Sequence, residues 1–200
     1  MQSRRTLLFA LLACQVAVGQ ADCCRSTDDF PWRDLPAVGK TLDVEVDATA
    51  PRYRFHPGES AFAAFRLPMA SAPYRIEIRA LATPDPAVPG NWRVFYPQAA
   101  LLDADHLVSR TTGAENARPQ PVGSELAPEG AYVLYVPVDP AADAERYLVI
   151  HTVPPAEAPT PSPGWLRSRN PAMRAALGWQ AGPSETGKLR ITVLPTNGAR

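Results

Sequence analysis

Short apolar runs, separated by proline and glycine, make up most of this chain. Two of them alternate apolar and charged residues with a period of two, at 41–47 ("TLDVEVD") and 72–82 ("APYRIEIRALA"). This period places one face of a strand in a core and the other in water, which is typical of antiparallel sheets. The 23 prolines are more than twice the usual share and disfavour long helices. The sequence therefore predicts an all-β chain.

The run at 72–82 predicts which side chains face the core. Its apolar residues would point inward and its charged residues outward, with Tyr74, Ile76, Ile78 and Ala80 on the first face and Arg75, Glu77 and Arg79 on the second. The second face and the acidic stripe Asp43–Glu45–Asp47 are solvated faces in the ordinary interpretation, and contact surfaces in the alternative one.

Five further stretches predict strands, and turn-forming residues stand between them. The last of them is expected to return and pair with the main sheet. The stretches are 59–68, 92–112 (two or three short strands, with "DADH" turning between Leu102 and Leu107), 132–138, 146–153 and 188–195. Many short strands with Pro/Gly turns indicate an antiparallel β-sandwich, jelly-roll-like in character.

Two segments near the C-terminus break this pattern. Residues 154–164 ("PPAEAPTPSPG") predict a stiff, Pro-rich spacer. Residues 170–178 predict one short helix, with Asn170 as N-cap, Pro171 at the first helical position and Gly178 closing the end. Residues 22–200 are therefore expected to form a single β-sandwich domain with one short C-terminal helix.

Residues 1–21 have the three parts of a secretory signal peptide. Arg4 and Arg5 precede an apolar run over 6–18, and "GQA" at 19–21 offers small residues for cleavage after Ala21. The expected location is the periplasm. The alternative is a lipoprotein, because "LLAC" at 11–14 resembles a lipidation site at Cys14, whereas Asp22 makes Cys23 a poorer site. Only lipidation would tie the chain to a membrane.

The charge balance gives no support to two classes of partner. Of 20 basic and 20 acidic residues, two arginines leave with the signal peptide, so the exported chain carries a net charge of about −2. No basic patch argues for nucleic acid or for an anionic membrane surface. The sequence predicts no cofactor.

Cys23 and Cys24 are adjacent, and the expected compartment is oxidising. Neighbouring Cα atoms are about 3.8 Å apart, closer than a relaxed disulfide prefers. A bond between them would be a strained ring that stabilises the fold little. The residues leave three readings open: a vicinal disulfide, an intermolecular bridge, or a modified anchor.

Catalysis and metal binding have weak support. His56, His106 and His151 lie near no G-x-S-x-G motif, and the expectation is that they are surface or packing residues, so no enzyme is predicted. Asp103, Asp105 and His106 are a weak start for a cation site. A hairpin turn in which Asp side chains bond their own backbone explains them better.

Aromatic side chains beside turns suit sugar recognition in secreted β-sandwiches. The candidates for sugar contact are Trp32, Trp92, Trp165 and Trp179. A tryptophan at a strand end also commonly seals the end of a core, so direct sugar binding is one of two interpretations.

Several stretches in the same order resemble the maltose operon periplasmic protein (MalM) family. They are "CCRSTDDFPWRDLP", "YRFHPGESAFAAFRLP", "VFYPQAALLDADHLVSR", "EGAYVLYVPVD" and "GKLRITVLP". The resemblance implies a non-enzymatic periplasmic accessory protein of maltose or maltodextrin transport, acting through contacts with an oligosaccharide, an envelope transport protein or an outer-membrane porin.

A second resemblance concerns the fold alone. "FHPGESAFAAF", "LLDAD" and "PEGAYVLYV" look like the small jelly-roll domains that follow secreted bacterial peptidases. This resemblance implies the alternative function, a secreted binding or chaperone-like module with no role in sugar uptake.

Overall fold

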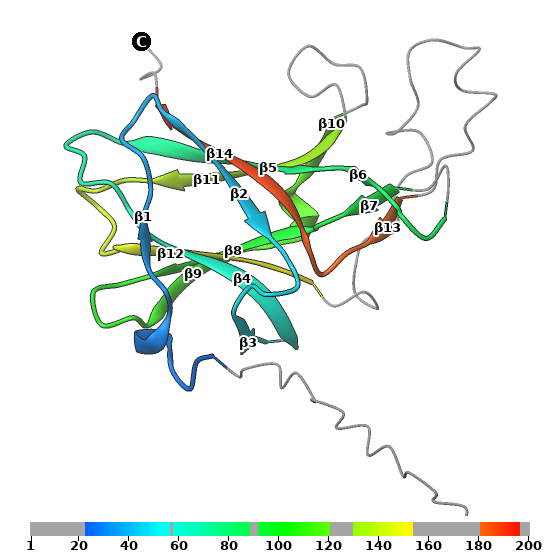
Figure 1. Cartoon of the computed structure of the whole chain (residues 1–200). Coiled ribbons are helices and arrows are strands. Elements are labelled where there is room, and N and C mark those ends of the chain that lie inside the picture. Colours follow the sequence, from blue (N-terminus) through cyan, green and yellow to red (C-terminus); the bar gives the residue numbers. More distant parts are fainter. Residues whose placement is uncertain (1–22, 57, 89–91, 121–129, 154–180, 197–200) are drawn as a thin grey trace, which may run out of the picture.

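Two sheets packed face to face organise the part of the chain described by the computed structural model, residues 23–56, 58–88, 92–120, 130–153 and 181–196 (Figure 1). The predicted signal peptide, spacer and helix, and also Trp165 and Trp179, lie outside these residues. A small third sheet lies to one side and contains β6 (Thr83–Pro84), β7 (Trp92–Val94) and β13 (Ala181–Pro183).

The first large sheet, sheet A, has the strand order β1-β4-β12-β8-β9, with β3 also paired to β4. Its strands are β1 (Arg33–Asp34), β3 (Arg52–Arg54), β4 (Glu59–Arg66), β8 (Pro97–Leu102), β9 (Val108–Thr112) and β12 (Tyr147–Thr152). Sheet B has the order β10-β11-β5-β14-β2. Its strands are β2 (Thr41–Val46), β5 (Tyr74–Leu81), β10 (Arg118–Gln120), β11 (Ala131–Val138) and β14 (Gly187–Pro195).

The pairing of the longer strands confirms the β-sandwich and its jelly-roll character. In chain order these strands are β2, β4, β5, β8, β9, β11, β12 and β14, and they pair first with last, second with seventh, third with sixth, and fourth with fifth. This is a long antiparallel ribbon rolled into two sheets, the arrangement of a jelly roll. Two short strands depart from the antiparallel prediction, because β1 pairs with β4 and β13 with β7 in parallel.

The alternating residues of the two sheets meet in one core. Side chains from both layers are almost fully buried there, among them Ile76, Ile78, Leu101, Leu134, Leu148, Ile150 and Ile191. The last strand, β14, lies between β5 and β2 and pairs with both, which confirms that residues 188–195 return to the main sheet.

The outward face of β5 is less exposed to solvent than its sequence predicts. Glu77 and Arg79 are only 8% and 7% exposed, so the expected solvated face is wrong for these two residues. The Arg79 guanidinium donates to the Glu77 carboxylate at 2.6 Å and also contacts the side-chain oxygen of Gln120. Pairing of the opposite charges allows the stripe to be buried, which removes Arg79 as an exposed contact residue.

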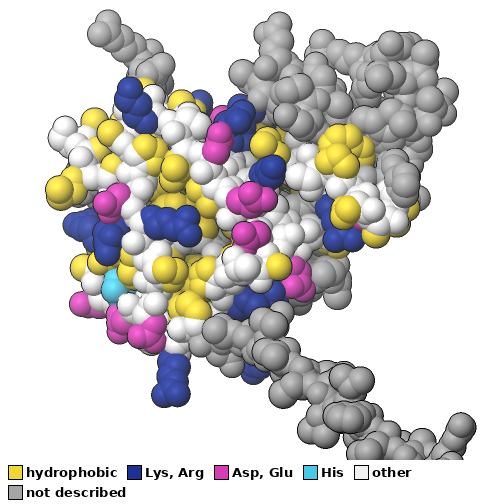
Figure 2. Space-filling view, viewed as in Figure 1, with side chains coloured by type: hydrophobic (Ala, Val, Ile, Leu, Met, Phe, Trp, Pro, Cys, Tyr) yellow, Lys and Arg dark blue, Asp and Glu magenta, His cyan; other side chains and the backbone are white. Residues whose placement is uncertain are grey.

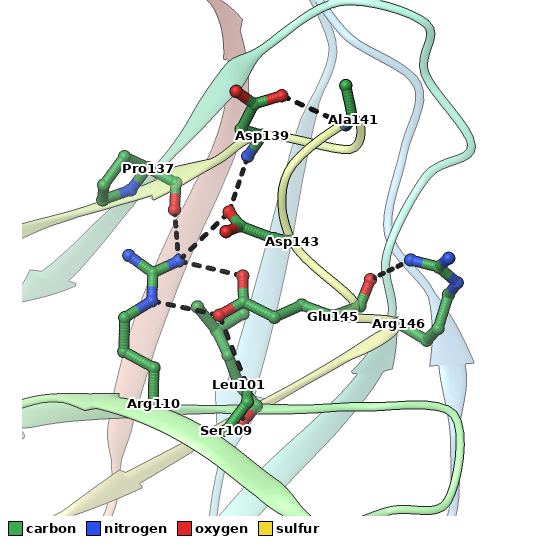
Figure 3. Close-up of polar contacts among 9 residues, drawn as sticks. All are labelled: Leu101, Ser109, Arg110, Pro137, Asp139, Ala141, Asp143, Glu145 and Arg146. Carbon is green, nitrogen blue, oxygen red and sulfur yellow. Dashed lines mark hydrogen bonds and ion pairs between the residues drawn. The ribbon is translucent and has the colours of Figure 1, made fainter.

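One arginine joins the edge strand β9 of sheet A to β11 of sheet B (Figure 3). Arg110 of β9 donates from Nε and Nη2 to the two carboxylate oxygens of Glu145, at 3.0 and 2.9 Å. Its Nη2 also donates to the backbone oxygen of Pro137 in β11, at 2.7 Å. Glu145 lies in the turn between β11 and β12 and is 7% exposed, whereas the Arg110 side chain is 36% exposed, so this bidentate pair is partly buried. The bond to the Pro137 oxygen is the contact that joins sheet A to sheet B.

Candidate binding surface

Sheet A is apolar on both faces. Its residues alternate along the strands, and those pointing away from the sandwich core form a second buried cluster that includes Phe62, Ala64, Ala100, Leu102 and Val149. Such a face has to be covered, because exposed apolar patches of this size are uncommon in monomers.

Residues 23–32 form the N-terminal segment, which covers part of this face. Phe30 is 4% exposed, and its ring centroid lies 4.3 Å from that of Phe62. A short 3-10 turn, Thr27–Asp29, precedes it. The Asp29 carboxylate accepts the backbone N–H groups of Arg25 and Ser26, both at 3.1 Å, and so fixes the turn locally.

Four partly exposed rings surround Phe30 and form what we call the aromatic surface: Trp32, Tyr53, Phe55 and Tyr147. The ring centroids of Trp32 and Tyr147 are 4.6 Å apart, and those of Tyr53 and Phe55 are 5.1 Å apart. Phe30 contacts both pairs, at 5.5 Å from Trp32 and 4.9 Å from Tyr53. The surface is therefore continuous, although its members come from three separate stretches of chain.

His106 joins the same surface from the turn between β8 and β9. Its ring stacks on Trp32 with centroids 5.2 Å apart and planes 23° apart. Its Nδ1 contacts the Asp28 carboxylate, and its backbone oxygen accepts the Thr27 hydroxyl at 3.2 Å. His106 has a φ of 58°, a left-handed conformation that is uncommon outside glycine.

Two polar atoms in this stacked pair are buried without a hydrogen-bond partner. They are Trp32 Nε1 and His106 Nε2. Buried polar atoms are nearly always paired, and strained backbone tends to collect at functional positions. The two atoms and the left-handed His106 occur together where the N-terminal segment meets the β8–β9 turn.

The "DADH" stretch forms a hairpin turn in which an Asp side chain bonds the local backbone, as its sequence predicts. Asp103 Oδ1 accepts the backbone N–H groups of Asp105 at 2.9 Å and of Leu107 at 3.0 Å. Within the described residues, no group of three or more His, Cys, Asp or Glu side chains could hold a metal ion.

His151 lies on the same outer face, away from His106. Its ring stacks on Phe55 with centroids 4.1 Å apart and planes 6° apart, and it is 5% exposed. Burial lowers its pKa to about 4, with a smaller opposing effect from the backbone oxygen of Thr152. His151 is therefore a neutral, packed ring at pH 7.

The structure separates the predicted site residues. Cys23 and Cys24 are bonded to one another, which is the vicinal disulfide of the three alternatives. Cys24 packs against the same cluster as Trp32. Trp92, by contrast, lies in β7 and packs against the main core. Sequence reasoning missed Phe55 and the stacking role of His106. The local signals for the site were two closely spaced aromatic pairs, Phe30 with Trp32 and Tyr53 with Phe55.

Charged side chains of both signs are spread over the face shown in Figure 2, with hydrophobic side chains between them. The stripe Asp43–Glu45–Asp47 is exposed, as the alternation predicts, and Asp43 accepts from Arg190 at 2.7 Å. Among the described residues, no helix has the length and apolar character needed to cross a bilayer.

Comparison with known proteins assigns no family to this chain. No family model matches the sequence, and no curated protein matches it. A solved structure with similarity is the pre-peptidase C-terminal domain of collagenase from Bacillus anthracis, with a TM-score of 0.34 and 7% identity. The alignment covers 82% of this chain and 95% of that one. The jelly-roll assignment stands on the strand pairing of the chain itself.

Proposed function

We propose that this chain is a non-enzymatic binding module of the cell envelope, an accessory of maltodextrin uptake whose aromatic surface contacts the oligosaccharide. The observation that carries the proposal is the continuous set of partly exposed rings, Trp32, Tyr53, Phe55 and Tyr147. Flat aromatic rings with polar edges suit the mixed apolar and polar faces of a sugar ring. The resemblance to the MalM family supports the choice of sugar.

The environments of the two packed histidines support a role without catalysis. His151 is neutral and stacked on Phe55. His106 is held by Asp28 and Trp32, and its free Nε2 is buried, out of reach of a substrate in this conformation. A general base has to lie within hydrogen-bond reach of the proton that it abstracts.

A titration of intrinsic tryptophan fluorescence with a linear maltodextrin tests the proposal. We expect a saturable change in the unmodified chain. Because one aromatic contact with a sugar is worth on the order of 1.5 kcal/mol, Trp32→Ala should weaken the affinity about tenfold, measured by titration calorimetry since this variant lacks the reporting ring. Trp92→Phe is the matched control, since Trp92 packs against the main core, and it should bind like the unmodified chain.

An unchanged spectrum up to millimolar sugar would refute the carbohydrate contact. Release of reducing ends from the maltodextrin during the incubation would refute the non-enzymatic role.

One observation favours the second function, a secreted module that binds a protein and no sugar. Leu107 and Val108 follow His106 directly and are 64% and 58% exposed. Adjacent exposed hydrophobic residues are typical of contact surfaces between proteins. Crosslinking in intact envelopes separates the two functions: a recovered partner, together with a flat sugar titration, would favour the second.

A further inference from the structure

The two sulfurs of the Cys23–Cys24 disulfide lie in different surroundings. Cys23 is exposed, whereas Cys24 is partly buried and packs against the cluster that contains Phe30 and Phe62. The Cys24 Sγ lies 3.6 Å from the backbone oxygen of Asp29. An approaching molecule therefore reaches the sulfur of Cys23 more readily than that of Cys24.

A disulfide with one accessible sulfur favours one direction of thiol exchange. An incoming thiolate that attacks Cys23 forms a new S–S bond to that sulfur and breaks the bond between Cys23 and Cys24. The electron pair of the broken bond leaves on the Cys24 sulfur, which then takes a proton from solvent. The incoming thiol supplies the only co-reactant, and the step involves no net oxidation or reduction.

The Asp29 carbonyl marks where the Cys24 sulfur lies. A disulfide sulfur has no hydrogen to donate, whereas a thiol is a weak hydrogen-bond donor. The acceptor at 3.6 Å is therefore in place for the Cys24 thiol once the displaced sulfur has taken its proton. This contact would keep Cys24 beside Cys23, within reach for the return reaction.

The segment that carries the pair is held by contacts that do not involve the disulfide. The Asp29 carboxylate accepts the backbone N–H groups of Arg25 and Ser26, the Thr27 hydroxyl donates to the backbone oxygen of His106, and Phe30 is buried. Opening the ring would therefore leave Cys23 on an ordered segment. A partner bonded to Cys23 would remain docked at a fixed place.

We propose that the vicinal pair is a thiol-exchange site, at which an exposed thiol of a partner forms a mixed disulfide with Cys23. Cys24 is then the resolving thiol, which attacks the Cys23 sulfur to release the partner thiol and restore the ring. The ligand class is a thiol, whether of a protein or of a small molecule. The inference depends on the two sulfur environments and is independent of sugar binding.

Glutathione is the probe for the first experiment. The protein is purified from the envelope with Cys14→Ser, so that Cys23 and Cys24 are its only cysteines. It is then incubated with limiting reduced glutathione. Free thiols are then alkylated and the peptides mapped by mass. In the chains that react, we expect one glutathione on Cys23 and the alkyl group on Cys24. Glutathione on Cys24, an equal distribution, or no adduct would overturn the proposal.

A matched pair of variants gives a second readout. Cys24→Ser leaves only the Cys23 thiol, and Cys23→Ser leaves only the Cys24 thiol. Because exchange rates follow access and thiolate content, oxidised glutathione should modify Cys24→Ser about tenfold faster than Cys23→Ser. Equal rates, or the opposite order, would overturn the proposal. Thermal unfolding of both variants shows whether they fold. If either does not, the peptide map of the protein that retains both Cys23 and Cys24 tests the proposal by itself.

Discussion

Burial of the His151 imidazole makes the stability of this chain depend on pH. The folded pKa is lowered to about 4, below the ordinary 6.5, so the unfolded chain binds the proton more tightly. The contribution of His151 to the unfolding free energy is fully present above pH 6.5 and is lost as the pH falls toward 4. Between pH 7 and pH 5 the linkage contributes ~2 kcal/mol to the loss of unfolding free energy.

Replacement of this histidine should remove that part of the pH dependence. In His151→Phe, the difference in unfolding free energy between pH 7 and pH 5, from urea titrations, should shrink by ~2 kcal/mol. His56→Asn is the control, because His56 is exposed and its replacement should leave the difference as it was. An unchanged difference in His151→Phe would mean that folding does not lower the pKa of this imidazole.

Glu145 is the buried partner of Arg110. Its side chain is 5% exposed and accepts from Nε and Nη2 of Arg110, so Glu145→Gln leaves the arginine with only Asp143 as a counter-charge, at 3.9 Å. We expect a loss of ~2 kcal/mol in unfolding free energy, measured by urea titration. The exposed pair Arg190–Asp43 is the control, and Asp43→Asn should cost less than about 0.5 kcal/mol. Equal costs would contradict a special role for the Glu145 link.

At the scale of elements, β14 is the strand that completes the roll. It fills the place between β5 and β2, and Ile191 on its inward face is fully buried. Ile191→Ala should lower the unfolding free energy by ~3 kcal/mol, because it deletes buried methyl groups and leaves a cavity. Lys188→Ala, on the exposed face of the same strand, should change it by less than about 0.5 kcal/mol in the same chemical denaturation measurement. A small cost for Ile191→Ala would mean that β14 adds little to the core.

At the scale of the whole molecule, the disulfide contributes little to stability. It joins neighbouring residues, so it closes almost no loop and hardly restricts the unfolded chain. Reduction should therefore move the thermal midpoint by less than ~2 °C. Calorimetry with and without a phosphine reductant measures this shift. A fall of more than about 5 °C would show that the ring holds the N-terminal segment on sheet A.

Sequence alone determined the strands and the class of fold, because a period of two is a local property of the chain. Residues 41–47 specify a strand and its buried face without reference to any neighbour, and β2 lies there. Residues 132–138 are apolar at almost every position and specify a strand, β11, but not its buried face. The short strands β3, β10 and β13 carry too few residues for a period to appear, and they depend on the strands that they pair with.

The tertiary structure alone decided the burial of charge and the composition of the aromatic surface. Glu77 and Arg79 alternate like solvent-facing residues, and their mutual ion pair and the contact with Gln120, 41 residues beyond Arg79, allow their burial. Trp32 and Trp92 are alike in sequence, but one joins the aromatic surface and the other the main core. Contacts between distant residues follow from the closure of the roll, and no local pattern in the chain encodes them.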